Sequence, residues 1–258
     1  MRTLILSDIH CGSIFGLTPP QWQRKKDDGF QPHLWDWYCE RIYAHAPYDL
    51  VLFLGDATEG IGKRGNIDIG VNDTNEQAKM AVEVLRKIPL SKSARIEFCY
   101  GTPFHGTGSS KHEDLVAVSF DAVPAKTHRL IVDGVRINAE HTGRRSGTAY
   151  GQASQAALPA VKDELRAQRG GGESANIYYR AHVHYYFLSS WCNKDGVVRA
   201  YNVPCLKYPF DDFAIALDPM MYNMGFMVHE FKDGHMTKEC LEIFDWETKG
   251  EIWKYKTV

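Results

Sequence analysis

Uninterrupted apolar runs alternate with helical patterns in the first half of the chain. Apolar and aromatic residues recur at helical spacing over 32–46, and Asp73 followed by Glu76 forms the capping-box pattern that opens a second helix. The apolar runs predict three buried strands, at 2–7, 49–54 and 96–100. This order of strands and helices is typical of a parallel sheet with crossover helices.

The pattern changes in the second half, where short strand-like segments follow one another. Segments 130–133 and 135–140 predict a hairpin across Asp133-Gly134, and a helix is expected from near Pro159 to the glycines at 170–172. Further strands are predicted at 177–179, 185–191, 197–201, 226–231 and 240–244. We therefore expect an α/β fold, a two-sheet β-sandwich flanked by helices, in a single domain over residues 1–258.

The composition is that of a globular protein and excludes one broad class of function. Of the 258 residues, 44% are apolar and 24% are charged. Lys and Arg total 30 against 32 Asp and Glu, so the net charge is −2. This balance excludes a broadly basic protein that coats nucleic acid by charge alone, although it allows a local basic groove.

Neither a membrane span nor a disulfide framework is indicated. No apolar run approaches the ~20 residues that cross a bilayer, and the first residues lack the layout of a signal peptide. The six cysteines are scattered, without a Cys-x-x-Cys pair. We expect free thiols in a reducing compartment, and hence a soluble, cytoplasmic protein with no membrane partner.

Carboxylate and imidazole side chains stand where the predicted strands end: Asp8, His10, Asp56, His105, His141, His182 and His184. Strand ends form the ligand crevice of open α/β sheets. Residues i and i+2 of an extended segment point to the same side, so Asp8 with His10, and His182 with His184, are each expected to present two ligands toward one point. A mixed set of imidazoles and carboxylates suits Zn, Mn, Fe or Ni better than Ca.

These residues belong to motifs that follow one another along residues 1 to about 190: Asp8-Ile9-His10, Gly55-Asp56, Gly101-Thr102-Pro103-Phe104-His105, His141 and Ala181-His182-Val183-His184. In this order the chain resembles the calcineurin-like metallophosphoesterase superfamily, whose members are binuclear hydrolases of phosphomonoesters or phosphodiesters. The resemblance implies two divalent ions, for which we expect Mn, with Fe, Zn or Ni as alternatives. It implies one ion held by Asp8, His10, Asp56 and His184, and a second held by Asp56 as a bridge together with His141 and His182.

The chain departs from the family pattern in two motifs. Ala181 replaces a glycine, which its small side chain makes tolerable. Thr102 stands where the family has an asparagine that ligates the second metal, so this site is expected to be weaker or completed by water. His105 is the predicted catalytic residue, the general acid that protonates the leaving group, although it could instead become a ligand. His112 is the rival candidate for that role.

Arg144 and Arg145 follow His141 closely and are candidate substrate-binding residues, because a guanidinium fork matches two phosphate oxygens. The alternative is a solvated turn with two ordinary surface arginines.

A pair of divalent ions lowers the pKa of water enough to supply hydroxide near neutral pH. We therefore expect a phosphoesterase that hydrolyses phosphate esters, with a preference for phosphodiesters in nucleotides or nucleic acid. A phosphomonoesterase is the alternative, and a non-catalytic metal-binding scaffold of the same fold is a second.

Overall fold

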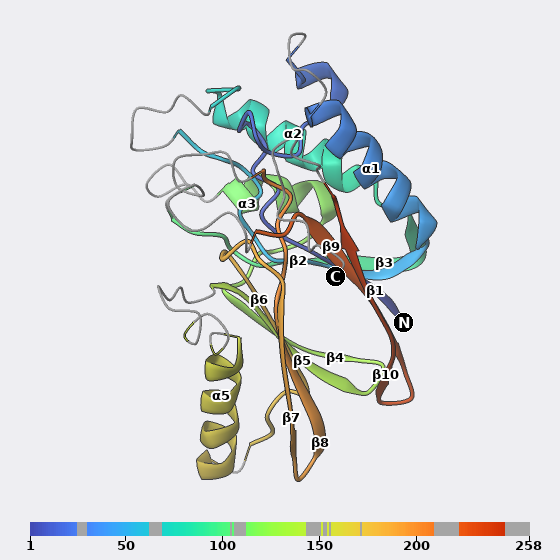
Figure 1. The fold of residues 1–258 in the computed structure, drawn as a ribbon, viewed down its shortest axis with the longest axis vertical. Helices are drawn as coiled ribbons and strands as arrows, with labels where there is room; N and C mark the ends of the chain where they lie inside the picture. Colours follow the sequence, from blue (N-terminus) through green and yellow to red (C-terminus); the bar gives the residue numbers. More distant parts are fainter. Residues whose placement is uncertain are drawn as a thin grey trace, which may run out of the picture.

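The computed structural model of the chain contains two five-stranded sheets with helices outside them (Figure 1). This confirms the expected α/β sandwich flanked by helices. The structure describes residues 1–24, 30–61, 69–103, 105, 112–142, 151, 154, 156–170, 172–208 and 222–245.

The first sheet joins the parallel strands of the N-terminal half to a C-terminal hairpin. Its strands are β1 (Arg2–Leu6), β2 (Tyr48–Phe53), β3 (Leu90–Phe98), β9 (Gly225–Lys232) and β10 (His235–Ile243). They lie in the order β10-β9-β1-β2-β3, with β1, β2 and β3 parallel and β9 antiparallel to β1. Leu6 pairs with Phe53, so β1 and β2 end at the same edge of the sheet.

The second sheet brings two further strand ends to a common edge. Its strands are β4 (Thr127–Val132), β5 (Val135–Thr142), β6 (Ile177–Ala181), β7 (Phe187–Asn193) and β8 (Gly196–Asn202). The order is β4-β5-β6-β8-β7, and β5 and β6 are parallel. The predicted hairpin is confirmed, because β4 and β5 pair antiparallel on either side of Asp133-Gly134.

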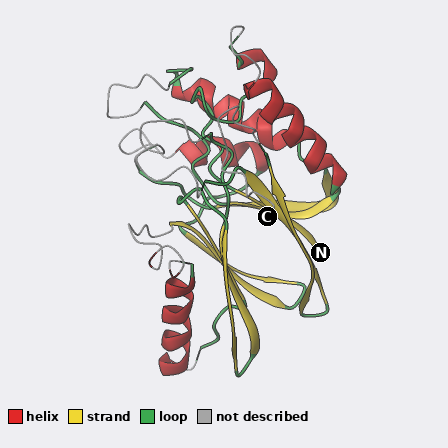
Figure 2. Cartoon of the chain, viewed as in Figure 1, coloured by secondary structure: helices red, strands yellow, loops and turns green. Residues whose placement is uncertain are grey.

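The helices divide between the outer faces of the two sheets (Figures 1 and 2). They are α1 (Phe30–Ala44), α2 (Thr74–Arg86), α3 (His112–Ala117) and α5 (Ala157–Gly170), with short 3-10 turns at Pro20–Trp22 and Val118–Phe120. Asp73 caps α2 as predicted, since its carboxylate accepts hydrogen bonds from the backbone N–H of Asn75 and Glu76. Helix α3 was not predicted, because six residues are too few to display a periodic pattern.

Alternate side chains of the strands enter different cores. In β1, Leu4 packs in a cluster with residues of α1 and α2, whereas Ile5 packs with Tyr179 of the second sheet. On the outer face of the second sheet, Tyr178 packs in a smaller cluster with Ala160 of α5. Strands covered on both faces require continuous apolar runs, which is why β1 and β2 could be recognised in the sequence.

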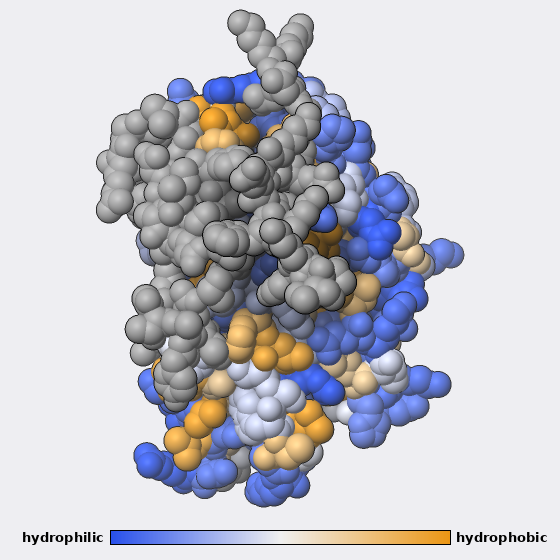
Figure 3. Space-filling model, viewed as in Figure 1, coloured by the Kyte–Doolittle hydropathy of each residue, from blue (hydrophilic) through white to orange (hydrophobic). Residues whose placement is uncertain are grey.

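The surface is largely polar on the face drawn in Figure 3, where hydrophobic residues form small separate patches. All six cysteines are free thiols, as predicted. None of the helices in the described part of the chain is long and apolar enough to cross a membrane. The single domain over residues 1–258 stays a prediction.

Candidate metal centre

Five of the predicted ligands adopt a left-handed backbone conformation just beyond the strand ends. Asp8, His10, Asp56, His182 and His184 have φ angles of 51°, 45°, 52°, 73° and 60°. Residues other than glycine adopt this region uncommonly, and its strain is retained where the surroundings over-determine it, as at functional sites. The expectation that Asp8 with His10, and His182 with His184, lie on extended segments is therefore wrong. Here the left-handed backbone, and not strand alternation, directs each side chain.

Two motif glycines are needed for close approach of the segments behind Asp56. A side chain at Gly101 would collide with Oδ1 of Asp56. Gly55 has a φ of +92°, and a Cβ there would lie 2.6 Å from the backbone N of Gly101. Glycine tolerates both the positive φ and the contact, so the segments that follow β2 and β3 can touch.

The first cluster consists of Asp8, His10 and His184, all buried. Nε2 of His184 lies 3.0 Å from Oδ1 of Asp8 and 3.3 Å from Nε2 of His10, and Nε2 of His10 lies 3.7 Å from the same carboxylate oxygen. Burial opposes ionisation of Asp8, but the imidazoles of His184 and His141 outweigh it and hold the pKa of Asp8 well below its usual value. Three ligand atoms thus face one another around an ionised carboxylate.

The second cluster consists of Asp56, His141 and His182. Nδ1 of His141 donates a hydrogen bond to the backbone O of Leu54 at 2.5 Å, which turns Nε2 toward Oδ2 of Asp56, 3.1 Å away. Despite burial, which raises it, the pKa of the Asp56 carboxyl is lowered by His141 and His105. Burial lowers the pKa of His141, but Asp56 and Asp8 overcome this and raise it to about 10. A cation bound here would displace that proton.

The six predicted ligands therefore divide between two clusters. His182 and His184 belong to different clusters, so the expectation that they face one point is wrong. The backbone N–H of His182 instead donates to Oδ2 of Asp8 at 3.3 Å, which ties the two clusters together. Asp56 groups with the second cluster, and its role as a bridge stays a prediction.

His105 lies between the two clusters. Its Nε2 is 3.8 Å from Oδ2 of Asp56, and its ring packs edge-on against that of His10 with centroids 4.6 Å apart. Nδ1 donates to the backbone O of Glu59 at 2.8 Å, which fixes the orientation of the ring. Burial lowers the pKa of His105, more than the nearby Asp56 raises it. The general-acid role of His105 stays a prediction.

Thr102 supports Asp56. Its backbone N–H donates to Oδ1 of Asp56 at 2.6 Å, and its hydroxyl lies 3.2 Å from each carboxylate oxygen. The hydroxyl thus orients a predicted ligand. Its own contribution to the second site stays a prediction.

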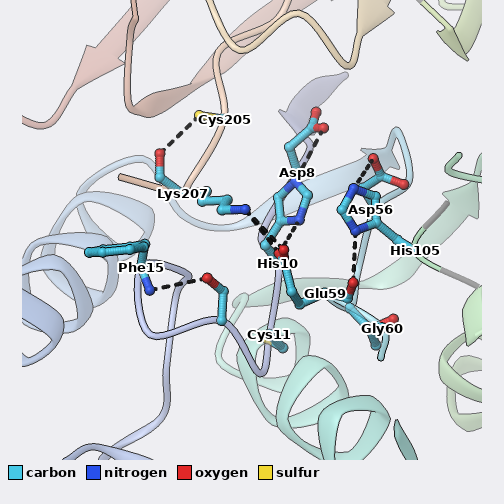
Figure 4. A network of polar contacts seen from close by, with 12 residues as sticks. Asp8, His10, Cys11, Phe15, Asp56, Glu59, Gly60, His105, Cys205 and Lys207 are labelled. Carbon is cyan, nitrogen blue, oxygen red and sulfur yellow. Dashed lines mark hydrogen bonds and ion pairs between the residues drawn. The ribbon is translucent and has the colours of Figure 1, made fainter. Parts of the chain in front are cut away.

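Glu59 and Lys207 form a charged support behind His10 that the sequence did not reveal (Figure 4). Oε2 of Glu59 lies 2.8 Å from Nδ1 of His10, and the ammonium of Lys207 lies 3.1 Å from both oxygens of Glu59. Burial raises the pKa of Glu59, but His10 and Lys207 lower it to about 2. A carboxylate behind a histidine sets its tautomer and orientation, so Glu59 would orient His10 if this histidine binds a metal.

The remaining candidates lie apart from the clusters or outside the described residues. His112 begins α3 and is buried, with Nδ1 2.7 Å from the hydroxyl of Thr58; it belongs to neither cluster. Arg144 and Arg145 lie outside the described residues, so their role in substrate binding stays a prediction.

The clusters fit divalent cations. Each brings three nitrogen or oxygen ligand atoms within 4.8 Å of one another. Nε2 of His141 is fully buried and faces Oδ2 of Asp56 at 3.1 Å, so a cation that displaces its proton would lie between an imidazole and a carboxylate. Imidazole with carboxylate is a donor set suited to Mn, Fe, Zn or Ni.

No family model matches the chain, and no curated protein matches it. Among solved structures, the chain is similar to an archaeal phosphodiesterase, with 10% identity over 94% of this chain and 100% of that one and a TM-score of 0.45. It is also similar to a metallophosphoesterase from Sphaerobacter thermophilus, with 13% identity over 96% of this chain and 90% of that one and a TM-score of 0.41. Both similarities are weak in sequence, with identities of 10% and 13%.

Proposed function

We propose that this protein is a metal-dependent phosphoesterase that hydrolyses phosphodiester bonds in nucleotides or nucleic acid, with two divalent ions, Mn first among them. The observation that carries the proposal is the meeting of two three-ligand clusters at one edge of the sandwich, with His105 against both. A pair of cations beside an imidazole would catalyse in-line displacement at phosphorus, because the cations stabilise charge on the phosphoryl oxygens and the imidazole protonates the leaving group.

The first cluster would hold one ion and the second cluster the other. Bound there, the ions would stabilise charge on the phosphoryl oxygens and lower the pKa of water. The chain's own contribution is orientation: Glu59 orients His10, the backbone O of Leu54 orients His141, and Thr102 orients Asp56.

The reaction consumes one water molecule. A bond forms from its oxygen to phosphorus, the bond from phosphorus to the ester oxygen breaks, and the departing oxygen takes a proton. His105 is the proposed donor, from Nε2, because its Nδ1 is held by the backbone O of Glu59. The proton lost by the water passes to solvent, and solvent reprotonates His105.

Hydrolysis of a chromogenic aryl phosphodiester and the matching monoester, with Mn²⁺ added, tests the proposal. The wild type should turn over the diester faster, and His105→Gln should reduce the rate about 10²- to 10⁴-fold, the range for loss of a general acid. His235→Ala, an exposed position that begins β10, is the matched control and should leave the rate unchanged. Faster turnover of the monoester would favour a phosphomonoesterase, and hydrolysis of neither ester with Mn, Fe, Zn or Ni would overturn the proposal.

A further inference from the structure

A second cleft, distinct from the metal centre, lies between the second sheet and α5. It encloses about 590 Å³, the size of a small-molecule pocket. Residues of β4, β5 and β6 form one wall, and α5, which stands along this sheet in Figure 1, forms the other. The lining includes five cations: Lys126, Arg129, Lys162, Arg166 and Arg180.

The carboxylates of the cleft do not cancel this charge. The lining holds two of them, Asp163 and Glu140, against the five cations, in a chain whose net charge is −2. Asp163 is already occupied: Arg129 donates to its Oδ1 at 2.5 Å and the hydroxyl of Tyr178 donates to its Oδ2 at 2.9 Å. The cleft is therefore a positive region on a weakly acidic protein.

Three of the cations keep their charge available. Lys126, Lys162 and Arg166 are exposed and form no ion pair within the described residues. Arg180 is 4% exposed. Its guanidinium donates to neutral oxygens, namely the backbone O and Oδ1 of Asn138, at 3.1 and 2.8 Å, and the backbone O of Tyr179, at 2.7 Å. Glu140, in the same lining, favours the charge of Arg180, so the exposed cations are the ones left for an anion.

The cleft begins beside the metal centre. Thr142, at its rim, is the residue after His141, and neighbouring Cα atoms are about 3.8 Å apart. Lys126 follows Ala125, whose backbone O accepts a hydrogen bond from Tyr100, just before Gly101 and Thr102. The end of β5 therefore belongs both to the cleft and to the second cluster, and an anion that occupies both must extend along this end of the strand.

We propose that this cleft binds the phosphates of a single-stranded oligonucleotide whose scissile phosphodiester lies at the metal centre. The inference rests on the proposed phosphodiesterase function and names its substrate as a strand longer than one nucleotide. Lysine and arginine bind successive phosphates of a strand, and a cleft of this volume admits a short stretch of single strand and not a duplex.

Binding of a fluorescent single-stranded oligodeoxythymidine to the full chain, in EDTA and over a series of salt concentrations, tests the inference. The triple variant Lys126→Gln/Lys162→Gln/Arg166→Gln removes three exposed cations of the cleft. Three lost phosphate contacts at about 0.7 each should reduce the slope of log K against log salt by about 2. The matched control, Lys92→Gln/Lys232→Gln/Lys238→Gln, removes the same charge from exposed positions on β3, β9 and β10 and should retain the wild-type slope.

Equal loss of binding in both triple variants, or wild-type binding by the cleft variant, would overturn the inference, as would tighter binding of a duplex of the same length. Hydrolysis of the small aryl diester with Mn²⁺ is measured in parallel and should be unchanged in the cleft variant. A wild type that binds the strand through the cleft but hydrolyses no ester would contradict the proposed function separately.

Discussion

The metal centre and a third group of ligand-type side chains differ in what surrounds their carboxylates. Between α1 and β10, His45, Cys240 and Glu242 also bring ligand atoms within 4.8 Å of one another. There the guanidinium of Arg41 donates to both oxygens of Glu242, at 2.7 and 2.8 Å. The carboxylate of Glu242 is therefore already paired with the positive charge of Arg41, and this charge would repel a metal cation.

The carboxylates of the metal centre have no such partner. Within the described residues, no Lys or Arg forms an ion pair with Asp8 or Asp56, and their neighbours are imidazoles that can give up a proton to a metal. The backbone also differs between the two groups: Asp8 and Asp56 have positive φ, whereas Cys240 and Glu242 lie within a regular strand. Proximity of ligand types therefore does not by itself make a metal site; it also needs available lone pairs and a backbone that directs them.

The largest expected effect is that of removing a ligand from the second cluster. His141→Ala should lose one of two bound equivalents of Mn²⁺ and slow diester hydrolysis by at least ~100-fold, since loss of groups behind ligands already costs about 10- to 100-fold. Metal analysis after dialysis, together with the rate, measures this. His45→Ala removes the histidine of the third group and should keep both ions. A similar loss of bound Mn²⁺ in both variants would contradict the difference between the metal centre and the third group.

A smaller effect is expected from the support behind His10. Glu59→Gln should weaken metal binding at the first cluster by about 10- to 100-fold, because the amide orients His10 less strongly than a carboxylate. Calorimetric titration with Mn²⁺ measures the affinity. The substitution leaves Lys207 buried without its carboxylate, so Glu59→Gln/Lys207→Met separates loss of orientation from a buried charge. Wild-type affinity in both variants would contradict a role for Glu59.

Arg41→Gln tests whether Arg41 keeps metal cations away from the third group. Loss of two charge-assisted hydrogen bonds to Glu242 should lower the free energy of unfolding by roughly 1.5–3 kcal/mol without changing the metal content of the centre. Urea unfolding measures the first and metal analysis the second. With the guanidinium removed, Cd²⁺ should produce a thiolate absorption band that disappears in Arg41→Gln/Cys240→Ser. The same Cys240-dependent band in the wild type would show that Arg41 does not exclude cations.

The smallest effect is a dependence of stability on pH from the third group. Burial raises the pKa of Glu242, but hydrogen bonds from Arg41 and His45 lower it to about 2, against about 4.3 in an unfolded chain. Its stabilising contribution is therefore complete above the unfolded value and is lost as pH falls toward 2. In urea unfolding, wild type and Glu242→Gln should differ most near pH 7, and the difference should shrink below about pH 4 and nearly vanish as pH approaches 2. A constant difference between them would rule out this ionisation as the cause.

Local patterns determined much of the fold. The continuous apolar run at residues 2–7 indicated a buried strand, and both faces of β1 are indeed covered. Asp73 indicated the start of α2, because its side chain caps the first turn of the helix. The placement of β8 between β6 and β7 was not predictable, because pairing depends on contacts distant in sequence.

The candidate ligands were visible because Asp8, Asp56 and His141 stand at strand ends in motifs with a set order. Glu59 and Lys207 were not visible, because they are 148 positions apart and belong to no spacing pattern. The one signal for Glu59 was its place three residues after Asp56, in the segment that follows β2.

The amino-acid sequence by itself determined which residue types end the strands, and hence that carboxylates and imidazoles collect at one edge of a sandwich. The tertiary structure decided how they are shared: His182 and His184 separate because left-handed backbone turns their side chains toward different partners. It also decided that Arg41 forms an ion pair with Glu242, while the carboxylates of Asp8 and Asp56 face imidazoles. The physical reason is that electrostatic and ligand contacts depend on distance in space. The separation of two segments along the sequence does not indicate whether they are in contact in the folded protein.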